Sequence, residues 1–426
     1  MTQDRRAGYY RAELETMTLG ERRAYQSRRL RETLAAAWDR VPAVKNRLQQ
    51  AGMQLEEVRD LDDLERVPVM KKPELIAAQR QHLPFGGLCG LNPEELHRIY
   101  ISPGPIYEPG EAVGHDYRWA QALYAHGFRR GDIAQVTFNF NMVPVGFWLD
   151  EALRQLGCIC VPAGVGNTEL QLQIMRELRV TAYLGTPSFL ATIADRAEEI
   201  GLDLKRDLQL EVAFVAAEVL TESLRGNLEE RFGMMVRQSY GTADVGCLGF
   251  ECGAKAGMHL PDDAIVEIVD PKSGRPVDPN EPGEVVATVF DRAYPLIRFG
   301  TGDLSLVTED PCACGRTSPR LVRILGRVDQ AAKVKGLFIH PNQVDDVSKR
   351  IAELGNCQVV VTRQANQDRM VFRAEVVTSG FDPGELADRV GRMVQEIFRL
   401  KSEVDLLPPS SIAVGAKKID DQRKWD

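Results

Sequence analysis

Apolar and polar positions follow different periods in different parts of the chain. Over the first 80 residues apolar side chains recur at helical spacing, as in "RRLRETLAAAWDRV", which predicts helices. From about residue 116, short apolar runs such as "DIAQVTF", "CICVPA" and "EVAFVAA" alternate with helical stretches such as "VGFWLDEALRQLG". This alternation of strands and helices predicts a parallel or mixed sheet that is covered on both faces.

Capping residues set the expected limits of the helices in this region. The stretch "HDYRWAQALYAHG" is helical in its pattern, and we expect Thr168 to cap the next long helix with Gln171 completing a capping box. Thr186 is the expected N-cap of the following helix, because a proline comes directly after it. Thr221 is expected to cap one more, which ends at Gly233.

The pattern changes near residue 260. The runs "AIVEIVD", "GEVVATVF" and "LSLVTED" predict strands of an all-β subdomain. After "LGRVDQ" a smaller α+β unit follows, with strands around Lys333 to His340, a helix from Pro341 to Gly355, two strands and a last helix. The expected fold is α/β: a large domain (1–329) with doubly wound mixed sheets and a β subdomain, then a small mobile α+β domain (330–426).

Length and charge narrow the class of protein. A chain of 426 residues suggests more than one domain. The formal net charge of −8 argues against a nucleic-acid partner. No stretch approaches about 18 consecutive apolar residues, and the charged N-terminus lacks an apolar signal region. We therefore expect a cytoplasmic protein without membrane attachment, and leave a homodimer open.

Four residues supply a possible metal site. Cys252 and His259 form C-x6-H, and Cys312 and Cys314 form C-x-C. Three thiolates and one imidazole make a full tetrahedral set for a closed structural Zn²⁺ site, which would join the two ends of the β subdomain. The alternative is a tight turn with buried thiols.

Several long segments resemble one family. "SYGTADVGCLGFEC", "YPLIRFGTGDLSLV", "CACGRTSPRLVRILGRVDQ" and "GVGNTELQLQIMRELRVTAYLGTPSFL" resemble the phenylacetate–CoA ligase branch of the adenylate-forming enzymes, and "VPVMKKPEL" and "KGLFIHPNQVDDV" fit as well. The resemblance spans nearly the whole chain. It implies that a carboxylic acid is activated with ATP to an acyl-adenylate, and that the acyl group then passes to coenzyme A.

The resemblance also implies roles for individual residues. Asp303 in "RFGTGD" would hold the ribose through its carboxylate on a glycine turn. Glu218 would border the adenine, and Tyr240 with Gly241 would border the adenine and the α-phosphate, where glycine permits close approach. Asp244 stands where the family has a glutamate that serves Mg²⁺, and it keeps the hard oxygen ligand. The same family turn carries the Cys-x-Cys-Gly sequence and a matching upstream Cys and His, which favours zinc.

Two residues near the composition break match the family's interdomain hinge. Arg327, also counted with the nucleotide-binding residues, and Asp329 lie in "LGRVD". In this superfamily the small domain rotates between the two half-reactions, and the hinge residue absorbs the backbone change. The alternative is an ordinary linker with a turn aspartate.

The phosphate-binding loop departs from the family pattern over Ser102–Pro109. Ser102 and Gly104 are kept, but Glu108 stands at the family's lysine, and two prolines remove backbone N–H donors. A carboxylate about 4 Å from a phosphate repels it by roughly 4 kcal/mol at an effective dielectric near 20. We expect this loop to bind a triphosphate poorly, unless Glu108 recruits Mg²⁺ or the loop points away.

The C-terminal tail is the second departure. Aligning the ends places Gly415 at the family's catalytic lysine, so Lys417, two residues later, is the candidate for that role. A flexible tail could bring Lys417 into place, and the alternative is a solvated basic tail. The segment "FNFNMVPVGF" is expected to line the acid pocket, with Phe138 and Phe140 as its apolar residues.

The function predicted from these features is that of an AMP-forming acid–CoA ligase that activates an aryl or related carboxylic acid. A variant would pass the acyl group to an acceptor other than coenzyme A. The altered loop and tail also favour an alternative, a degenerate member that binds AMP, acyl-adenylate or acyl-CoA without ligating anything.

Overall fold

The computed structural model describes residues 4–102, 105–111, 113–334, 337–364, 367–413 and 415–423. The chain packs as two compact units. The first consists of residues 1–281, 285–301 and 306–323, and the second of residues 282–284, 302–305 and 324–426.

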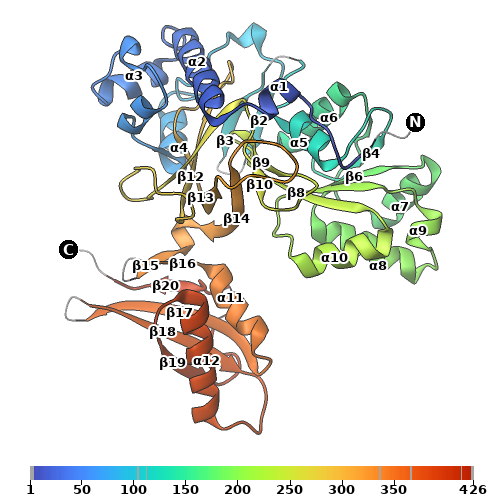
Figure 1. Cartoon of the computed structure of the whole chain (residues 1–426), viewed down its shortest axis with the longest axis vertical. Helices are drawn as coiled ribbons and strands as arrows, with labels where there is room; N and C mark the ends of the chain where they lie inside the picture. The colour runs from blue at the N-terminus through green and yellow to red at the C-terminus, as the bar shows by residue number, and fades with distance from the viewer. Residues whose placement is uncertain are drawn as a thin grey trace. The chain divides into compact units, whose positions relative to one another are not determined.

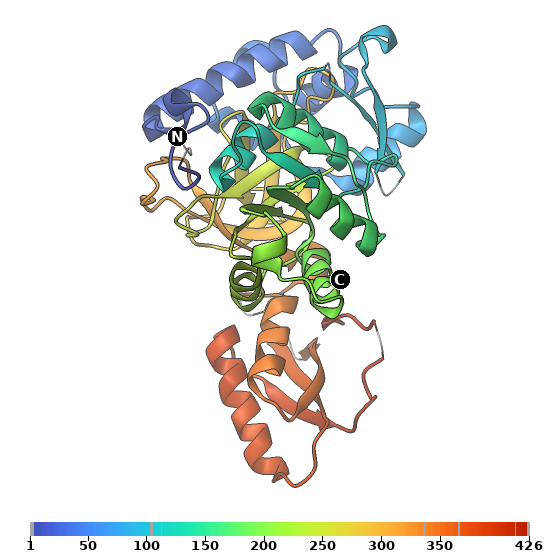
Figure 2. The same cartoon turned by 90° about the vertical axis from the view of Figure 1, so that its right-hand side faces the viewer.

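The N-terminal part of the first unit is helical, as its pattern predicts. Thr18 and Glu21 form a capping box at the start of the long helix α2, seen in blue in Figure 2. The apolar side of α2 packs through Leu30 and Leu34 into a buried cluster. The helices here are α1 (Ala12–Glu15), α2 (Leu19–Ala37), α3 (Pro42–Gln50) and α4 (Lys72–Gln81), with short 3-10 turns at Leu55–Glu57, Asp62–Arg66 and Pro93–Glu95.

A mixed sheet runs through the first unit. The described strands follow the order β11-β12-β13-β14-β10-β9-β8-β7-β6-β4-β5, with β1 beside β13. The strands from β8 to β5 are parallel, and the β8–β9 pair is antiparallel. Their bounds are β1 (Met70–Lys71), β4 (Ile133–Val136), β5 (Ile159–Val161), β6 (Ala182–Gly185), β7 (Val212–Val215), β8 (Met235–Thr242), β9 (Gly246–Glu251), β10 (Met258–His259), β11 (Ala264–Val269), β12 (Gly283–Val289), β13 (Phe299–Thr308) and β14 (Arg320–Arg327).

Helices cover both faces of the parallel strands (Figure 1). Along β7, Val212 and Phe214 join the buried cluster of α5 and α6, whereas Ala213 and Val215 join the cluster of α7, α8 and α10. This alternation is what a strand buried on both sides requires. The α/β fold class is therefore confirmed. The helices are α5 (Trp119–His126), α6 (Val145–Leu156), α7 (Thr168–Glu177), α8 (Pro187–Glu199), α9 (Leu204–Asp207) and α10 (Glu222–Phe232).

Two helix starts differ from the prediction. Asn167, not Thr168, caps α7: it adopts a left-handed φ of 50° and its side chain accepts from the Leu170 N–H. Asparagine tolerates this conformation better than most residues. The helix predicted from residue 115 begins only at Trp119, because Tyr117 and Arg118 also have positive φ. Thr186 and Thr221 cap α8 and α10 as predicted.

The predicted β subdomain is not a sheet of its own. Strands β11 to β14 continue through β10 and β9 into the parallel strands. The "RFGTGD" motif is also not a free turn, because β13 already begins at Phe299 and contains it. Gly302 has a φ of +76° inside this strand, which is why the glycine suggested a turn.

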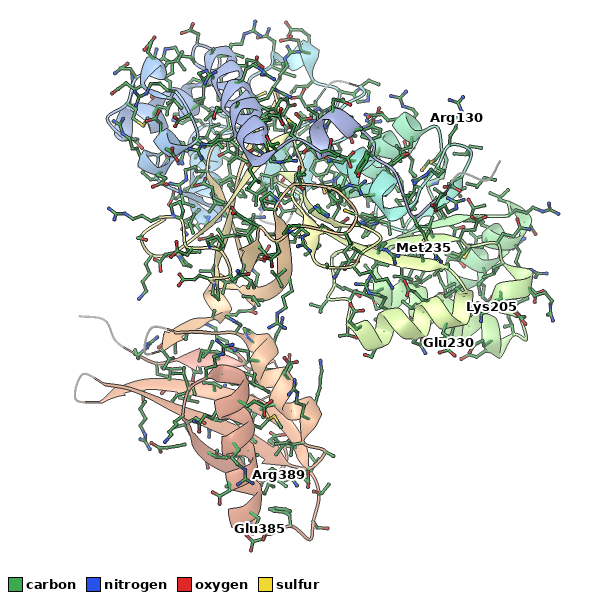
Figure 3. The ribbon with its side chains drawn as sticks, in the orientation of Figure 1. Arg130, Lys205, Glu230, Met235, Glu385 and Arg389 are labelled. Atoms are coloured by element: carbon green, nitrogen blue, oxygen red, sulfur yellow. The ribbon has the colours of Figure 1, made fainter. Side chains whose placement is uncertain are left out.

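The C-terminal stretch of the second unit is an α+β structure. Its described strands form a sheet of order β19-β18-β17-β20 and a separate pair β15-β16. Helix α12 packs on it through Phe398, whose ring meets that of Phe372 edge-on at 6.2 Å, while Glu385 and Arg389 lie one turn apart on α12 (Figure 3). The elements are β15 (Ala332–Val334), β16 (Leu337–Ile339), α11 (Pro341–Arg350), β17 (Leu354–Gln364), β18 (Gln367–Val376), α12 (Pro383–Phe398), β19 (Glu403–Leu407) and β20 (Ile419–Asp421).

Two expectations about this unit are corrected. The helix that starts at Pro341 ends at Arg350, because Gly355 already belongs to β17. The tail is not simply a solvated basic segment, since β20 pairs in parallel with β17 from Ile419 to Asp421. Among the described helices, none is long and apolar enough to cross a membrane.

Candidate functional site

The altered loop lies on a small hairpin, β2 (Ile99–Ser102) and β3 (Ile106–Pro109). Its two middle residues, Pro103 and Gly104, fall outside the described part of the chain. Glu108 is only 3% exposed, and the Ser102 hydroxyl donates to its Oε1 at 2.8 Å. The Glu108 carboxylate therefore lies inside the unit and is held from one side by the hairpin itself.

A second buried carboxylate lies close to Glu108. Asp244 follows β8, and its Oδ2 is 3.1 Å from Lys72 Nζ and accepts from Thr242 Oγ1 at 3.4 Å. Burial, and then the charge of Asp244, raise the pKa of Glu108 well above its ordinary value, although Ser102 and Lys72 oppose this. Glu108 Oε2 and Asp244 Oδ1 are buried and have no hydrogen-bond partner among the described residues.

Helix α4 positions both the lysine and the hairpin. Gln79 Nε2 donates to the Tyr107 carbonyl at 2.7 Å, and the Tyr107 N–H donates to Gln79 Oε1 at 2.9 Å. Gln79 Nε2 also donates to the Tyr294 hydroxyl at 3.2 Å. Lys72, Gln79 and Tyr294 were not singled out from the sequence. The seven-residue spacing of Lys72 and Gln79 could have shown that they share one face of a helix.

The residues predicted to border the adenine and α-phosphate lie on β8. The Tyr240 hydroxyl donates to Thr301 Oγ1 at 3.1 Å. A Cβ on Gly241 would lie 2.3 Å from the Gly246 carbonyl oxygen. No side chain fits there, so glycine keeps the backbone of β8 exposed to close approach.

Glu218 lies just after β7 and is exposed. Its carboxylate accepts from the Ser188 N–H at 3.2 Å and from the Ser188 hydroxyl at 2.8 Å. Ser188 is in the first turn of α8, where the helix dipole favours a negative charge. These contacts fix the carboxylate at the carboxyl end of the parallel strands, where ligands bind in open α/β sheets.

Asp303 and Arg327 form an ion pair inside the second unit. Arg327 Nη1 lies 2.8 Å from Asp303 Oδ1, and a Cβ on Gly302 would lie 2.7 Å from Arg327 Nη2. Glycine therefore gives the guanidinium room to reach the aspartate. Asp329 lies in the 3-10 helix Val328–Gln330 with its side chain 78% exposed, 3.8 Å from Arg327 Nε.

The two candidate pocket phenylalanines differ in burial. Phe138 is buried, with its ring 6.2 Å from that of Phe214. Phe140 is half-buried and meets Phe147 edge-on at 5.3 Å. The same segment reaches the hairpin, because the Ile101 N–H donates to the Met142 carbonyl at 2.9 Å.

Lys417 lies in the second unit, just before β20, and its side chain is exposed. Its carbonyl accepts from Gln358 Nε2 at 2.9 Å, and the neighbouring Lys418 Nζ is 3.1 Å from Asp345 Oδ1. Thus the first unit brings together the hairpin carboxylate, Lys72 and Asp244. The second unit brings together Asp303, Arg327 and Asp329, and carries Lys417 separately.

The four candidate zinc ligands lie together. Their ligand atoms are all within 4.8 Å of one another. Cys252 Sγ is 3.7 Å from Cys312 Sγ, and Cys314 Sγ is 3.4 Å from His259 Nε2. Two thiolates on one tetrahedral Zn²⁺, at about 2.3 Å each, would be about 3.8 Å apart. The spacing fits this ion.

Further contacts orient these ligands. His259 Nδ1 is 3.2 Å from the Ser318 carbonyl, which leaves Nε2 directed at the cysteines. The Ala254 and Arg316 N–H groups donate to the sulfurs of Cys252 and Cys314 at 3.4 Å. Hydrogen bonds from Cys252 and then from His259 lower the pKa of the Cys314 thiol. Such donors favour a thiolate.

Comparison with known proteins defines the class. A family model described as AMP-binding enzyme matches residues 142–288, and one described as AMP-binding enzyme C-terminal domain matches residues 336–423. The fold and the candidate residues are thus those of an AMP-binding, adenylate-forming enzyme.

Individual relatives narrow this class. A phenylacetate-coenzyme A ligase of Thermus thermophilus is 31% identical over 94% of this chain and 95% of the relative. A phenylacetate-coenzyme A ligase of Escherichia coli is 28% identical over 86% of this chain and 85% of its own. The solved structure of an open conformation of 2-hydroxyisobutyryl-CoA ligase, in complex with 2-HIB-AMP and CoA, is 26% identical with a TM-score of 0.89, covering 99% of this chain and 95% of that one. The chain belongs to the phenylacetate-coenzyme A ligase family.

Proposed function

We propose that this chain is an AMP-forming acid–coenzyme A ligase that acts on an aryl or related carboxylic acid. In the first half-reaction an oxygen of the substrate carboxylate attacks the α-phosphorus of ATP, and pyrophosphate leaves. In the second the thiol of coenzyme A attacks the acyl carbon, loses its proton, and AMP leaves. The named activity of relatives that align along nearly the whole chain supports this proposal.

The observation that carries the proposal is the Asp303–Arg327 ion pair. A carboxylate held at 2.8 Å by a guanidinium keeps a fixed position and remains an acceptor for ribose hydroxyls. Tyr240 and Gly241 would border the adenine and the α-phosphate, and Glu218 would border the adenine. Arg327 would help to hold the nucleotide through the same pair.

Mg²⁺ is part of the proposal, with Asp244 as a ligand. The residues fit the ion, because the buried Oδ1 has no partner among the described residues and Mg²⁺ prefers carboxylate oxygens. When bound, the ion would neutralise charge on the phosphates. Lys72 holds the other oxygen of Asp244 and so orients the carboxylate.

We assign the catalytic lysine role to Lys417 and the hinge role to Asp329, with domains divided at residues 329 and 330. Lys417 would bond the substrate carboxylate and the α-phosphate during adenylation. The high exposure of Asp329 supports a residue whose backbone is free to change. Phe140, with Phe138 behind it, would give the acid pocket its apolar wall.

Structural Zn²⁺ on Cys252, His259, Cys312 and Cys314 completes the proposed set of cofactors. The ligand set is closed, so the ion would contribute to folding and not to the reaction. A cytoplasmic location, the absence of nucleic-acid and membrane partners, and a homodimeric assembly belong to this proposal as well.

One observation favours a second candidate function. Glu108 is a buried carboxylate on the phosphate-loop hairpin, which suits a protein that binds AMP, acyl-adenylate or acyl-CoA without ligation. Transfer to an acceptor other than coenzyme A also remains a candidate.

Acid-dependent ATP–pyrophosphate exchange separates these candidates. We expect label from pyrophosphate to enter ATP only when a suitable acid from an aryl and short-chain panel is present. Exchange without thioester formation would point to another acceptor. Tight AMP binding with no exchange for any acid would support the non-ligating binder.

A further inference from the structure

We propose that Glu108 and Asp244 together form a divalent-cation site, with Mg²⁺ as the natural occupant. This inference deepens the proposed ligase function, because the ion would serve the same nucleotide site. It adds Glu108 as a ligand on the phosphate-loop hairpin and holds that the cation binds before any nucleotide.

Each carboxylate has one oxygen fixed by a neighbouring donor and one oxygen without a partner. The Ser102 hydroxyl donates to Glu108 Oε1 at 2.8 Å, and Lys72 Nζ lies 3.1 Å from Asp244 Oδ2. The remaining oxygens, Glu108 Oε2 and Asp244 Oδ1, are both buried and unpartnered among the described residues. Buried carboxylate oxygens without a partner are costly, so this arrangement calls for a ligand.

Neighbouring elements hold the two carboxylates in place. Gln79 bonds both backbone groups of Tyr107, the residue before Glu108. Lys72 begins the same helix and holds Asp244. One helix therefore fixes both ligands, as a cation site with few protein ligands requires.

The chemistry of the two oxygens selects the ion. Mg²⁺ takes hard oxygen ligands and is commonly bound by one or two carboxylates, with waters and substrate phosphates completing the octahedron. The donor set contains neither sulfur nor imidazole, which would favour Zn²⁺.

Charge explains what the site does for the nucleotide. With both carboxylates ionised, Glu108, Asp244 and Lys72 carry a net charge of −1, and a bound divalent ion changes this to +1. The surroundings of Glu108 then attract a triphosphate that the carboxylate alone would repel. Glu108 thus becomes a residue that recruits phosphate through the ion.

The direct test is a Mn²⁺ titration of the zinc-loaded full chain, without nucleotide or acid, followed by electron paramagnetic resonance of free Mn²⁺. We expect one site per chain that Mg²⁺ displaces, and about a tenfold or greater loss of affinity in both Glu108→Gln and Asp244→Asn. Glu94→Gln, at an exposed glutamate ahead of the hairpin, is the matched control and should bind as the unsubstituted chain does. Equal Mn²⁺ affinity in Glu108→Gln would overturn the proposal.

A second measurement covers loss of folding and separates this inference from the ligase proposal. Circular dichroism of each variant reports its fold, and calorimetric titration of ATP at several Mg²⁺ concentrations reports its site. Glu108→Lys should weaken ATP binding and leave it with little response to Mg²⁺. Stronger ATP binding in this variant would overturn the cation site, because Glu108 would then act only by repelling phosphate. Since neither measurement needs turnover, failure of the cation site would leave the ligase proposal standing.

Discussion

Asp291 is a buried carboxylate that binds two cationic side chains at once. Arg118 Nη1 lies 2.8 Å and His115 Nε2 lies 3.0 Å from its Oδ1. Burial opposes the charge on His115, but Asp291 outweighs it and raises the pKa of the imidazole; Arg118 acts against this rise and Glu111 supports it. A single residue thus links the segment ahead of α5 to the region after β12, and does so in a pH-dependent way.

The stability of the protein should therefore fall as pH rises above about 6.5, the ordinary pKa of histidine. Below that value His115 is protonated in both states and its contribution is complete. As pH rises through the folded-state pKa, the folded protein loses the bound proton and the contribution disappears. Urea unfolding between pH 6 and 8.5 should show a loss on the order of 1 kcal/mol, absent in His115→Gln and retained in His97→Gln. An unchanged pH slope in His115→Gln would contradict this account.

Strand alternation explains how Glu108 could have been placed from the sequence. Ile106 is fully buried, and Glu108, two residues later on β3, must face the same side. The sequence motif placed Glu108 at a phosphate-binding position, but only the hairpin register adds Ser102 as its donor. Asp244 is 136 residues away from Glu108 in the chain, so their proximity could not be predicted from local pattern.

At the scale of elements, capping chemistry was the most reliable sequence signal. Thr186 and Thr221 begin α8 and α10 as their hydroxyls require. The α7 start was missed because Asn167 and Thr168 are both good caps, and the left-handed backbone that favours asparagine is visible only in three dimensions. The continuity of β9 to β14 with the parallel strands depends on long-range pairing, which sequence periodicity does not encode.

The strand ends around β9, β10, β13 and β14 meet at the Cys/His cluster, and this gives a prediction for zinc. We expect about one Zn²⁺ per chain by elemental mass spectrometry. Structural zinc binding can be worth on the order of 10–16 kcal/mol, so Cys312→Ser should lose the metal and melt at a much lower temperature.

Cys89→Ser is the control for this substitution. Cys89 lies outside the cluster, and its thiol donates to the Leu91 carbonyl at 3.2 Å, which a serine hydroxyl can also do. Metal-free protein with an unchanged melting temperature would show that the cluster is only a turn of buried thiols.

At the scale of the whole molecule, the chain divides into two compact units, and the second begins its long C-terminal stretch at residue 324. The composition break near Asp329 indicated such a division from the sequence. The contribution of residues 282–284 and 302–305 to the second unit was not foreseeable, because they are distant in sequence and belong to β12 and β13.

Asp329→Pro tests whether the proposed domains move between half-reactions. Proline fixes φ near −65° and so restricts the backbone change that a hinge must absorb. We expect ATP–pyrophosphate exchange and thioester formation to fall by clearly different factors, whereas Asp329→Ala, which keeps the backbone free, should reduce both little. Equal losses in the two half-reactions of Asp329→Pro would argue against a moving domain.

The most direct test of the proposed function is a complete turnover assay with ATP, Mg²⁺, coenzyme A and a panel of aryl and short-chain carboxylic acids, read by chromatography and mass spectrometry. The account predicts that one or more acids yield AMP and the matching acyl-CoA in equal amounts. Omitting the acid should abolish both products, and Lys417→Ala should lower both while leaving AMP binding intact. If the folded, zinc-loaded chain binds AMP but forms neither AMP nor thioester with any acid, it is a binding protein on a ligase fold, and the central claim is wrong.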